Sequence, residues 1–291
     1  MPYLNSYTPP GPLEEKEWHA DTPAQAYDLN FVYPEPQEPF ETKRGVRVEP
    51  LIPSLHGRRL YTLFSSHPDG FLFLPYGPFP SYAAFLTHLE KLRRDSATLL
   101  FVVYDLALDL ENGDDDLRDG GKLRAERIAG IVGVLKSREH DRMTEIGHLH
   151  IPPLFQRTHV LTHSISLLLH WILDAPSPSS PSLGLRRAQW FANRLNVPSI
   201  SAAERLGFRL EATDMAWERV LPPKKGQGVE LPAFVQGERR EQEEKVGKGR
   251  HSACLGLGWD LWEEEGRKKV DALVAREVKR RKASDVPGLL A

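Results

Sequence analysis

Residues 145 to 174 read EIGHLHIPPLFQRTHVLTHSISLLLHWILD, and this stretch decides the fold class. Its first part alternates like a β-strand, two prolines and a short polar turn follow, and a long amphipathic helix completes it. Free backbone N–H groups and the positive end of the helix dipole meet at such a turn, so it can hold an anion, often a phosphate. The same turn can also be only a connection.

The sequence around this stretch predicts an α/β sheet packed on helices. A nearly continuous apolar run at 97–108 is expected of a central strand, and the strands at 127–140 and 143–151 are expected to form an antiparallel hairpin. Helices are expected at 54–66 and 81–95, each after a serine that could cap it. Further strands are predicted at 184–192, 209–221 and 251–259, and further helices within 196–208 and 262–281.

Composition narrows the class of protein. The formal charge of -2 and the pI near 6.6 give no reason to expect a polyanionic partner such as nucleic acid. The single cysteine, Cys254, excludes an internal disulfide and every multi-cysteine metal site, and it is expected to be a buried apolar residue. The first residues lack the pattern of a signal peptide, and the apolar run around His170 is too short for a membrane span. A soluble cytoplasmic protein without a bound metal is therefore expected.

Three regions differ from the ordered middle of the chain. Residues 1–43 are rich in proline and are expected to form an extended arm on a domain that spans 44–283. Residues 222–250 are expected to be a polar, mobile and solvated insert within that domain. The acidic residues of 111–126 are expected in a solvated hairpin excursion; they could instead bind a divalent cation, although their spacing fits no EF-hand.

The run from about 46 to 220 resembles the GNAT superfamily of acyl-CoA-dependent N-acyltransferases, and within it the branch of the ribosomal-protein N-terminal acetyltransferases, including fungal members. The resemblance is carried, in the family's order, by VRVEPLIPSLH, IAGIVGVL, TEIGHLHIPPLFQRTHVLTHSISLLL and LRRAQWFANRLNVPSISAAERLGF. It implies one α/β domain with a central, mostly antiparallel mixed sheet, splayed at its fourth and fifth strands, and helices on both faces. It also implies acetyl-CoA as co-substrate and an amine acceptor.

The family places the pyrophosphate of coenzyme A at the turn after the fourth strand. The family pattern there is Gln or Arg, two residues, Gly, one residue, then Gly or Ala, because glycine lets backbone amides approach the phosphates. Gln156 matches the first position, but His159 and Leu161 replace the glycines, a departure that could narrow the cradle. The cofactor contacts that the resemblance implies are Leu149, His150, Ile151, Gln156, Arg157, Thr158, His159, Val160, Leu161, Thr162, Asn196 and Ser199.

The reaction of this family needs few side chains. Glu145, on the fourth strand, is the candidate base, although it could equally be a solvated carboxylate of the hairpin. His148 and His150 lie two apart and are expected on one strand face, so either could relay a proton; a metal site would need a third ligand, which the sequence does not show. Ala203 stands where the family often has a tyrosine acid, so the leaving thiol, with a pKa of about 8.5, would depart as thiolate.

Three functions remain open from the sequence. The first is an acetyl-CoA-dependent N-acetyltransferase in which the amine attacks the thioester directly in a ternary complex. The second is a catalytically weak or inert binding protein with the same fold, which the missing glycines and tyrosine favour. The third is an unrelated α/β interaction domain. The acceptor is left open as a protein N-terminus, a lysine, a polyamine or another small-molecule amine.

Overall fold

The computed structural model describes residues 3–43, 45–110, 118–119, 122–123, 125–178, 181–221 and 228–285. Its main feature is an eight-stranded sheet. The strands lie in the order β1 (Phe40–Glu41), β2 (Val46–Pro50), β3 (Leu99–Asp105), β7 (Ile128–Arg138), β8 (Met143–His150), β9 (Arg187–Asn193), β11 (Lys248–Gly258) and β10 (Arg209–Leu221). Neighbours in this sheet are antiparallel except β8 and β9, which are parallel. The predicted mixed, mostly antiparallel sheet is confirmed.

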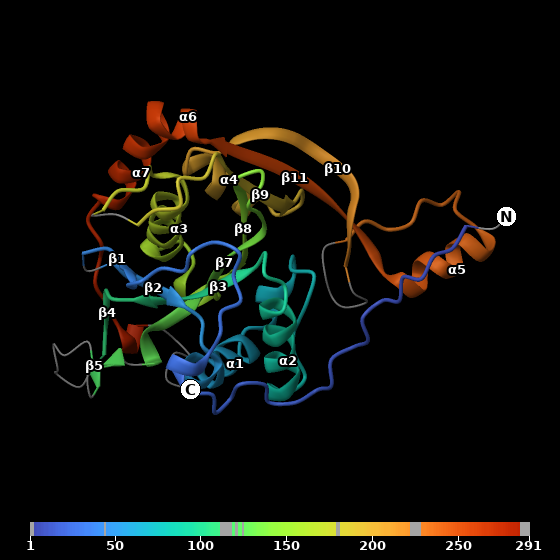
Figure 1. Cartoon of the computed structure of the whole chain (residues 1–291), viewed down its shortest axis with the longest axis horizontal. Coiled ribbons are helices and arrows are strands. Elements are labelled where there is room, and N and C mark those ends of the chain that lie inside the picture. The colour runs from blue at the N-terminus through green and yellow to red at the C-terminus, as the bar shows by residue number, and fades with distance from the viewer. Residues whose placement is uncertain are drawn as a thin grey trace.

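Helices cover both faces of the sheet (Figure 1). Helices α1 (Arg58–Ser65) and α2 (Tyr82–Arg93) lie on one face, while α3 (His159–Leu173) lies on the other with α7 (Arg267–Val274) packed against it. Helix α4 (Val197–Arg205) packs on β9, β10 and β11. Strand β3 is buried along its whole length, as its apolar run predicts, and Cys254 is buried as expected.

Strands β8 and β9 separate within the sheet. Their parallel pairing runs from Met143 opposite Arg187 to Ile146 opposite Trp190 and then stops, although β8 continues to His150 on the β7 side. The pairing of β8 with β7 also contains a bulge between Gly147 and His150. The splay between the fourth and fifth strands of the predicted fold therefore begins after Ile146.

Side-chain caps fix the starts of three helices. Ser81 accepts a hydrogen bond from the amide of Ala84 at the start of α2, as predicted, and Thr158 and Asn196 cap α3 and α4 in the same way. The predicted serine cap of the first helix was wrong. Ser54 donates its hydroxyl hydrogen to the Thr22 carbonyl instead, and a π-helical turn at Pro53–Gly57 precedes α1.

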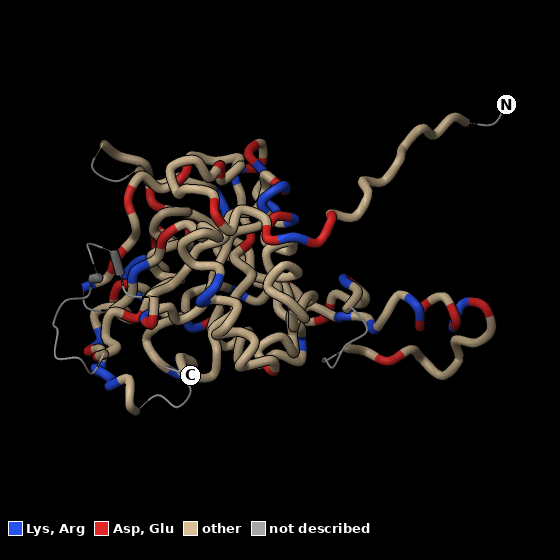
Figure 2. Tube along the Cα trace, turned by 90° about the horizontal axis from the view of Figure 1, so that it is seen from below, with Lys and Arg blue, Asp and Glu red and all other residues tan. Residues whose placement is uncertain are grey.

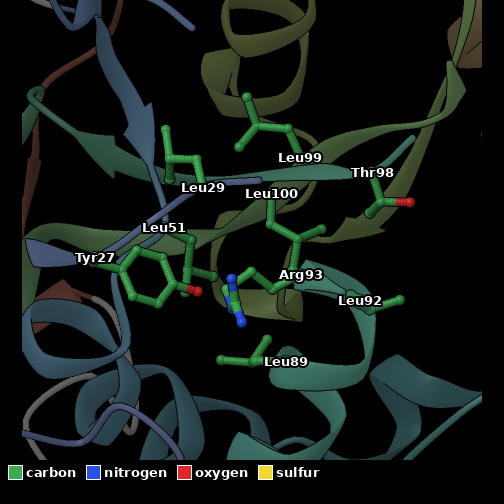
Figure 3. A pocket seen from close by; sticks show the side chains of 9 residues that line it. All are labelled: Tyr27, Leu29, Leu51, Leu89, Leu92, Arg93, Thr98, Leu99 and Leu100. Atoms are coloured by element: carbon green, nitrogen blue, oxygen red, sulfur yellow. The ribbon is translucent and has the colours of Figure 1, made fainter. Parts of the chain in front are cut away.

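The first 43 residues are partly anchored. Residues 3–12 are exposed, and Figure 2 shows the N-terminal trace leaving the body of the molecule. Further along, Tyr27 and Leu29 lie beside Leu51 and against α2 and β3 (Figure 3). The hydroxyl of the buried Tyr33 donates to the Arg138 carbonyl, and β1 adds an edge strand next to β2. Short 3-10 turns occur at Ala24–Ala26 and Pro68–Phe71.

The link between β10 and β11 contains a helix that was not predicted, α5 (Gly237–Val246), which has no buried residue. Residues 222–227 of the expected insert lie outside the described residues. Its last three residues belong to β11, where Arg250 is buried, so that end of the expected insert was wrong. Figure 1 shows the long β10–β11 pair extending from the sheet toward α5, and Figure 2 shows acidic and basic residues interspersed over the trace.

The C-terminal segment forms a separate two-stranded sheet beside the end of β3. The predicted helix at 262–281 was wrong after Val274: α6 (Trp259–Leu261), a π-helical turn at Trp262–Gly266 and α7 are followed by β12 (Arg281–Lys282), which pairs with β4 (Leu108–Asp109), and a 3-10 turn at Ala283–Asp285. The amide of Arg281 donates to the Ala107 carbonyl, and its guanidinium pairs with Asp105 at 2.8 Å. These contacts favour an extended chain over a longer helix.

The acidic excursion lies only partly within the described residues. Strands β5 (Arg118–Asp119) and β6 (Lys122–Leu123) pair as an antiparallel hairpin, followed by a 3-10 turn at Ala125–Arg127. The alternative of a divalent cation falls mainly on 111–117, which lies outside the described residues. None of the described helices is long and apolar enough to cross a membrane.

Candidate active site

A cleft of about 570 Å³, partly open to solvent, lies where β8 leaves β9. Residues of both strands line it, together with the segment before α2, the start of α4, and the β10–β11 pair. The lining includes five residues expected at the site: Glu145, His148, Leu149, Asn196 and Ser199. The separation of two parallel strands thus creates a concave surface where sequence reasoning placed catalysis.

Glu145 lies in this cleft between two cations. Its side chain is buried, with one carboxylate oxygen 3.0 Å from Lys136 Nζ and the other 3.6 Å from Arg219 Nη2. Burial raises the pKa of Glu145 above its ordinary value, while Lys136 and Arg219 oppose that shift. Glu145 is therefore not the solvated hairpin carboxylate that the sequence also allowed, and a raised pKa makes it a stronger base than an exposed glutamate.

The position of Lys136 depends on a bulge. The β7–β8 register shifts between Leu135, which faces Glu145, and Arg138, which faces Met143. Lys136 lies in this irregularity with a φ of 50°. Such a bulge redirects side chains, and here the Lys136 ammonium also lies 3.7 Å from Glu218 and over the ring of Phe191.

His148 forms a second polar contact in the cleft. It has a φ of 51° and lies at the β8 bulge, and its Nδ1 is 3.2 Å from the hydroxyl oxygen of Tyr76. Burial and the nearby Arg219 lower the pKa of His148 to about 4, so the ring is neutral at pH 7. A neutral imidazole can accept or pass on a proton beside Glu145.

The three residues after His148 differ in how far they reach the cleft. The His150 ring is buried and stacks on Phe64 with 3.9 Å between ring centroids, and it contacts Phe71 as well. Both histidines thus face the layer of α1 and the segment before α2. Since His150 and Ile151 are buried, they can meet a cofactor only through backbone groups, whereas Leu149 lines the cleft directly.

Asn196 and Ser199 bring the start of α4 to the cleft. The Asn196 side chain accepts a hydrogen bond from the Ser199 amide, and the Ser199 hydroxyl oxygen accepts one from Trp190 Nε1 at 3.0 Å. Both side chains are therefore held in place before any ligand binds. Ala203, further along α4, is fully buried, so a larger side chain there would meet the core.

The polar turn before α3 is held by its own side chains. The Gln156 amide nitrogen donates to the Ile151 carbonyl at 2.8 Å. The Thr158 hydroxyl donates to the Phe155 carbonyl and accepts from the Val160 amide. A 3-10 turn at Pro153–Phe155 precedes these contacts. Gln156 and Thr158 thus fix the shape of the turn, and Arg157 is left exposed with a φ of 59°.

The two residues that replace the family's glycines are held within the fold. His159 Nε2 lies 3.1 Å from the fully buried Asp105 Oδ1 and 3.1 Å from the Gly45 carbonyl oxygen. Leu161 packs on the hydrophobic core, and Val160 is fully buried. Neither replacement requires its side chain to stand over the first amides of α3, which have no partner within the helix.

A pocket of about 520 Å³ lies beside the start of α3. Thr158, His159 and Thr162 line it from one side. Arg205 from the end of α4 and Arg276 after α7 line it as well. One carboxylate, Glu277, lines it too, and the two guanidinium groups with the helix N-terminus are the parts that suit a phosphate ligand.

Comparisons with known proteins agree with this geometry. No protein-family model and no curated protein matches the chain. Among solved structures, a GCN5-related N-acetyltransferase from Brucella melitensis is 26% identical with a TM-score of 0.60, over 83% of this chain and 88% of that one. A structure assigned to the GNAT family from Chromobacterium violaceum is 22% identical with a TM-score of 0.58, over 90% and 99%. The fold is the GNAT fold.

A third match shows the same fold at lower similarity. Spermidine N-acetyltransferase from Vibrio cholerae, solved in complex with CoA and spermine, is 14% identical with a TM-score of 0.50, over 76% of this chain and 100% of that one. Its identity to this chain is low enough that the likeness concerns the GNAT fold alone. What each chain binds must be argued from its own residues.

Sequence reasoning missed several residues of this GNAT-fold cleft. Tyr76, Arg219 and Arg250 line it but were not expected there, because they come from a loop and a strand pair distant in sequence, and Lys136, which contacts Glu145 from a bulge, was not expected either. Within the described ranges, no group of three or more His, Cys, Asp or Glu side chains could hold a metal ion. The pocket in Figure 3 contains none of the expected site residues, so we assign it to the packing of the arm.

Proposed function

We propose that this protein is an acetyl-CoA-dependent N-acetyltransferase that transfers an acetyl group to an amine by direct attack in a ternary complex. The observation that carries the proposal is the separation of β8 from β9 after Ile146, with Glu145 and His148 in the cleft that it opens. We also place the chain in the branch that resembles ribosomal-protein N-terminal acetyltransferases of fungal type, on its sequence motifs.

The residues present fit a coenzyme A ligand. Beyond Ile146 the edge of β8 that faced β9 has no strand partner among the described residues, and Leu149 to Ile151 offer backbone groups there. Arg157, Arg205 and Arg276 lie near the first amides of α3 and would hold the phosphates. His159 is held by Asp105 while it lines one side of the pocket beside the start of α3, and Leu161 packs on the core, so a pocket remains although both glycines are replaced.

When bound, acetyl-CoA supplies a thioester whose carbonyl carbon an amine can attack. Glu145 accepts the proton that the attacking amine loses, directly or through one water molecule, and His148 with Tyr76 is placed to relay it. The new C–N bond replaces the C–S bond, and the sulfur leaves as thiolate. Asn196, fixed by the Ser199 amide, and Ser199, whose hydroxyl accepts from Trp190, orient the ligand near the cleft.

The second candidate is an inert or weak binding protein with the GNAT fold. Two observations favour it. Position 203 is a buried alanine, so the tyrosine acid of the family is missing. The Gln156 side chain is already hydrogen-bonded within the turn, to the Ile151 carbonyl. One experiment separates the two: incubation with acetyl-CoA and a panel of amines, with detection of released thiol. Acetyl-amine formation supports the enzyme, whereas acetyl-CoA binding without turnover on any amine supports the binding protein.

A further inference from the structure

Two arginines line the cleft on neighbouring strands. Arg219 on β10 and Arg250 on β11 are direct partners in the antiparallel ladder, and both border the cleft that holds Glu145. Like charges directly opposite each other destabilise a sheet, so this pair costs stability unless an anion lies between the two guanidinium groups.

Arg250 is attracted by Glu218 and Glu145 but forms an ion pair with neither. It is 5% exposed, its Nε is buried without a hydrogen-bond partner, and no ion pair to it occurs in the part of the chain that the structure describes. Arg219 contacts Glu218 through Nε at 3.2 Å, and its Nη2 lies 3.6 Å from Glu145 Oε1 but is buried without a hydrogen bond. Buried polar groups are normally satisfied, so these donors point to a missing partner.

The charges around the cleft do not balance. Three cations, Lys136, Arg219 and Arg250, surround two carboxylates, Glu145 and Glu218. Lys136 contacts both carboxylates, at 3.0 Å and 3.7 Å, and Ser252 donates to Glu218 at 2.9 Å. The carboxylates are thus already engaged, and one positive charge is left over at Arg250. A buried, unpaired cation is costly, and a bound anion would remove that cost.

We propose that Arg250, together with Arg219, binds a carboxylate of the amine acceptor, so that the substrates are amines that also carry a carboxylate. This inference rests on the proposed function and names its substrate class. Arginine forms paired hydrogen bonds to carboxylates, which suits both guanidinium groups. Since Arg219 Nη2 is 3.6 Å from the Glu145 carboxylate that would receive the proton, the acceptor's amine and carboxylate lie only a few bonds apart.

The first test measures binding without catalysis. The melting temperature is recorded with glutarate, with the neutral glutaramide and with inorganic phosphate, each with and without saturating coenzyme A. We expect glutarate alone to stabilise the parent, equally when coenzyme A is present, and this effect to vanish in Arg250→Gln. Arg194→Gln, which removes an exposed arginine paired with Asp214, is the matched control and should keep the effect.

Four results of this test overturn the inference. Stabilisation by phosphate but not by glutarate, or loss of the glutarate effect with coenzyme A, would assign Arg250 to a coenzyme A phosphate. Equal stabilisation of the parent and Arg250→Gln would remove Arg250 from any anion site. A melting temperature of ligand-free Arg250→Gln well below the parent's, with no ligand effect in the parent, would make Arg250 a structural residue. We expect that variant to be at least as stable as the parent, because a buried unpaired charge is removed.

The second test measures turnover with amine pairs in which the acid carries the only carboxylate: glycine with glycinamide and β-alanine with β-alaninamide. We expect kcat/KM to be higher for the acid of each pair by about tenfold to a hundredfold. Arg250→Gln should remove this preference and leave the KM for acetyl-CoA unchanged. Equal rates within pairs, or equal losses for both members, would refute the inference while leaving the transferase itself intact. Failure of acetyl-CoA to bind would instead refute the proposed function.

Discussion

His159 Nε2 lies 3.1 Å from Asp105 Oδ1, a contact that ties the first residue of α3 to the last residue of β3. Asp105 is fully buried and is held from the other side by Arg281 at 2.8 Å. These cationic or hydrogen-bonding partners hold the pKa of Asp105 below its ordinary value despite burial. Through Asp105, His159 thus joins α3 to β3 and to the C-terminal segment, although a side chain at this position would be expected to crowd a phosphate site.

The variant His159→Gly should therefore lose stability rather than gain affinity. Glycine removes one partner of a buried carboxylate, which costs about 1–3 kcal/mol, or several degrees of melting temperature. Calorimetric titration should give an acetyl-CoA affinity within about threefold of the parent's, since a threefold change corresponds to less than about 1 kcal/mol. His159→Asn, which keeps a donor, serves as the control. A large gain in affinity at unchanged stability would show that the imidazole crowds the cradle.

The base can be tested with Glu145→Gln. If Glu145 accepts the amine proton, the variant should lose about a hundredfold in turnover and keep nearly normal coenzyme A affinity. Asp214→Asn, which alters an exposed carboxylate paired with Arg194, is a control for charge. Steady-state kinetics with the best amine and calorimetry with coenzyme A provide the two readouts. Equal turnover in the variant and the parent would remove Glu145 from the mechanism.

The kcat/KM of the parent should increase with pH. Burial raises the pKa of Glu145 above 4.5, and the carboxylate form is the base, so kcat/KM should rise with pH through that raised pKa. The pKa of His148, lowered to about 4, adds no transition near pH 6.5. A rising limb that is lost in Glu145→Gln agrees with this assignment; a limb near pH 6.5 that is lost in His148→Ala contradicts it.

Acid should destabilise the fold through three histidines. Burial is the main cause that lowers the pKa of His88 to about 3 and the pKa values of His148 and His163 to about 4. Because the unfolded chain has histidines near pKa 6.5, it binds protons first, and the free energy of unfolding should fall as pH drops from about 6.5 toward 4. Urea unfolding at several pH values measures this, and His88→Phe should reduce the slope. A flat profile above pH 5 would contradict the lowered pKa values.

Local sequence patterns predicted most of the helices and strands but few of the contacts that form the cleft. The β8–turn–α3 stretch, the apolar β3 and the serine cap of α2 follow from periodicity and capping, which depend on neighbouring residues. The Arg219–Arg250 pair depends on the register of β10 against β11. Lys136 faces Glu145 because of a bulge that no local signal marks. The C-terminal helix stops at Val274 because distant contacts hold Arg281, which propensity does not report.

Limited proteolysis tests the outlying segments. Helix α5 buries no residue, and residues 3–12 are exposed, so these regions should be cut first and leave a folded core. Mass spectrometry of the fragments and the far-UV circular dichroism of the cut protein are the readouts. Collapse of the whole protein after one cut near Gly237 would show that the β10–β11 link is structural.

The central claim is that the turn before α3 holds the phosphates of coenzyme A, and calorimetric titration with acetyl-CoA tests it most directly. The parent should bind, and Arg157→Glu should weaken binding by well over tenfold, because a like charge replaces a donor beside the phosphates. Arg209→Glu, an exposed charge reversal outside both pockets, should bind like the parent. Absence of binding to the parent at millimolar acetyl-CoA would contradict the account and leave an inert GNAT fold.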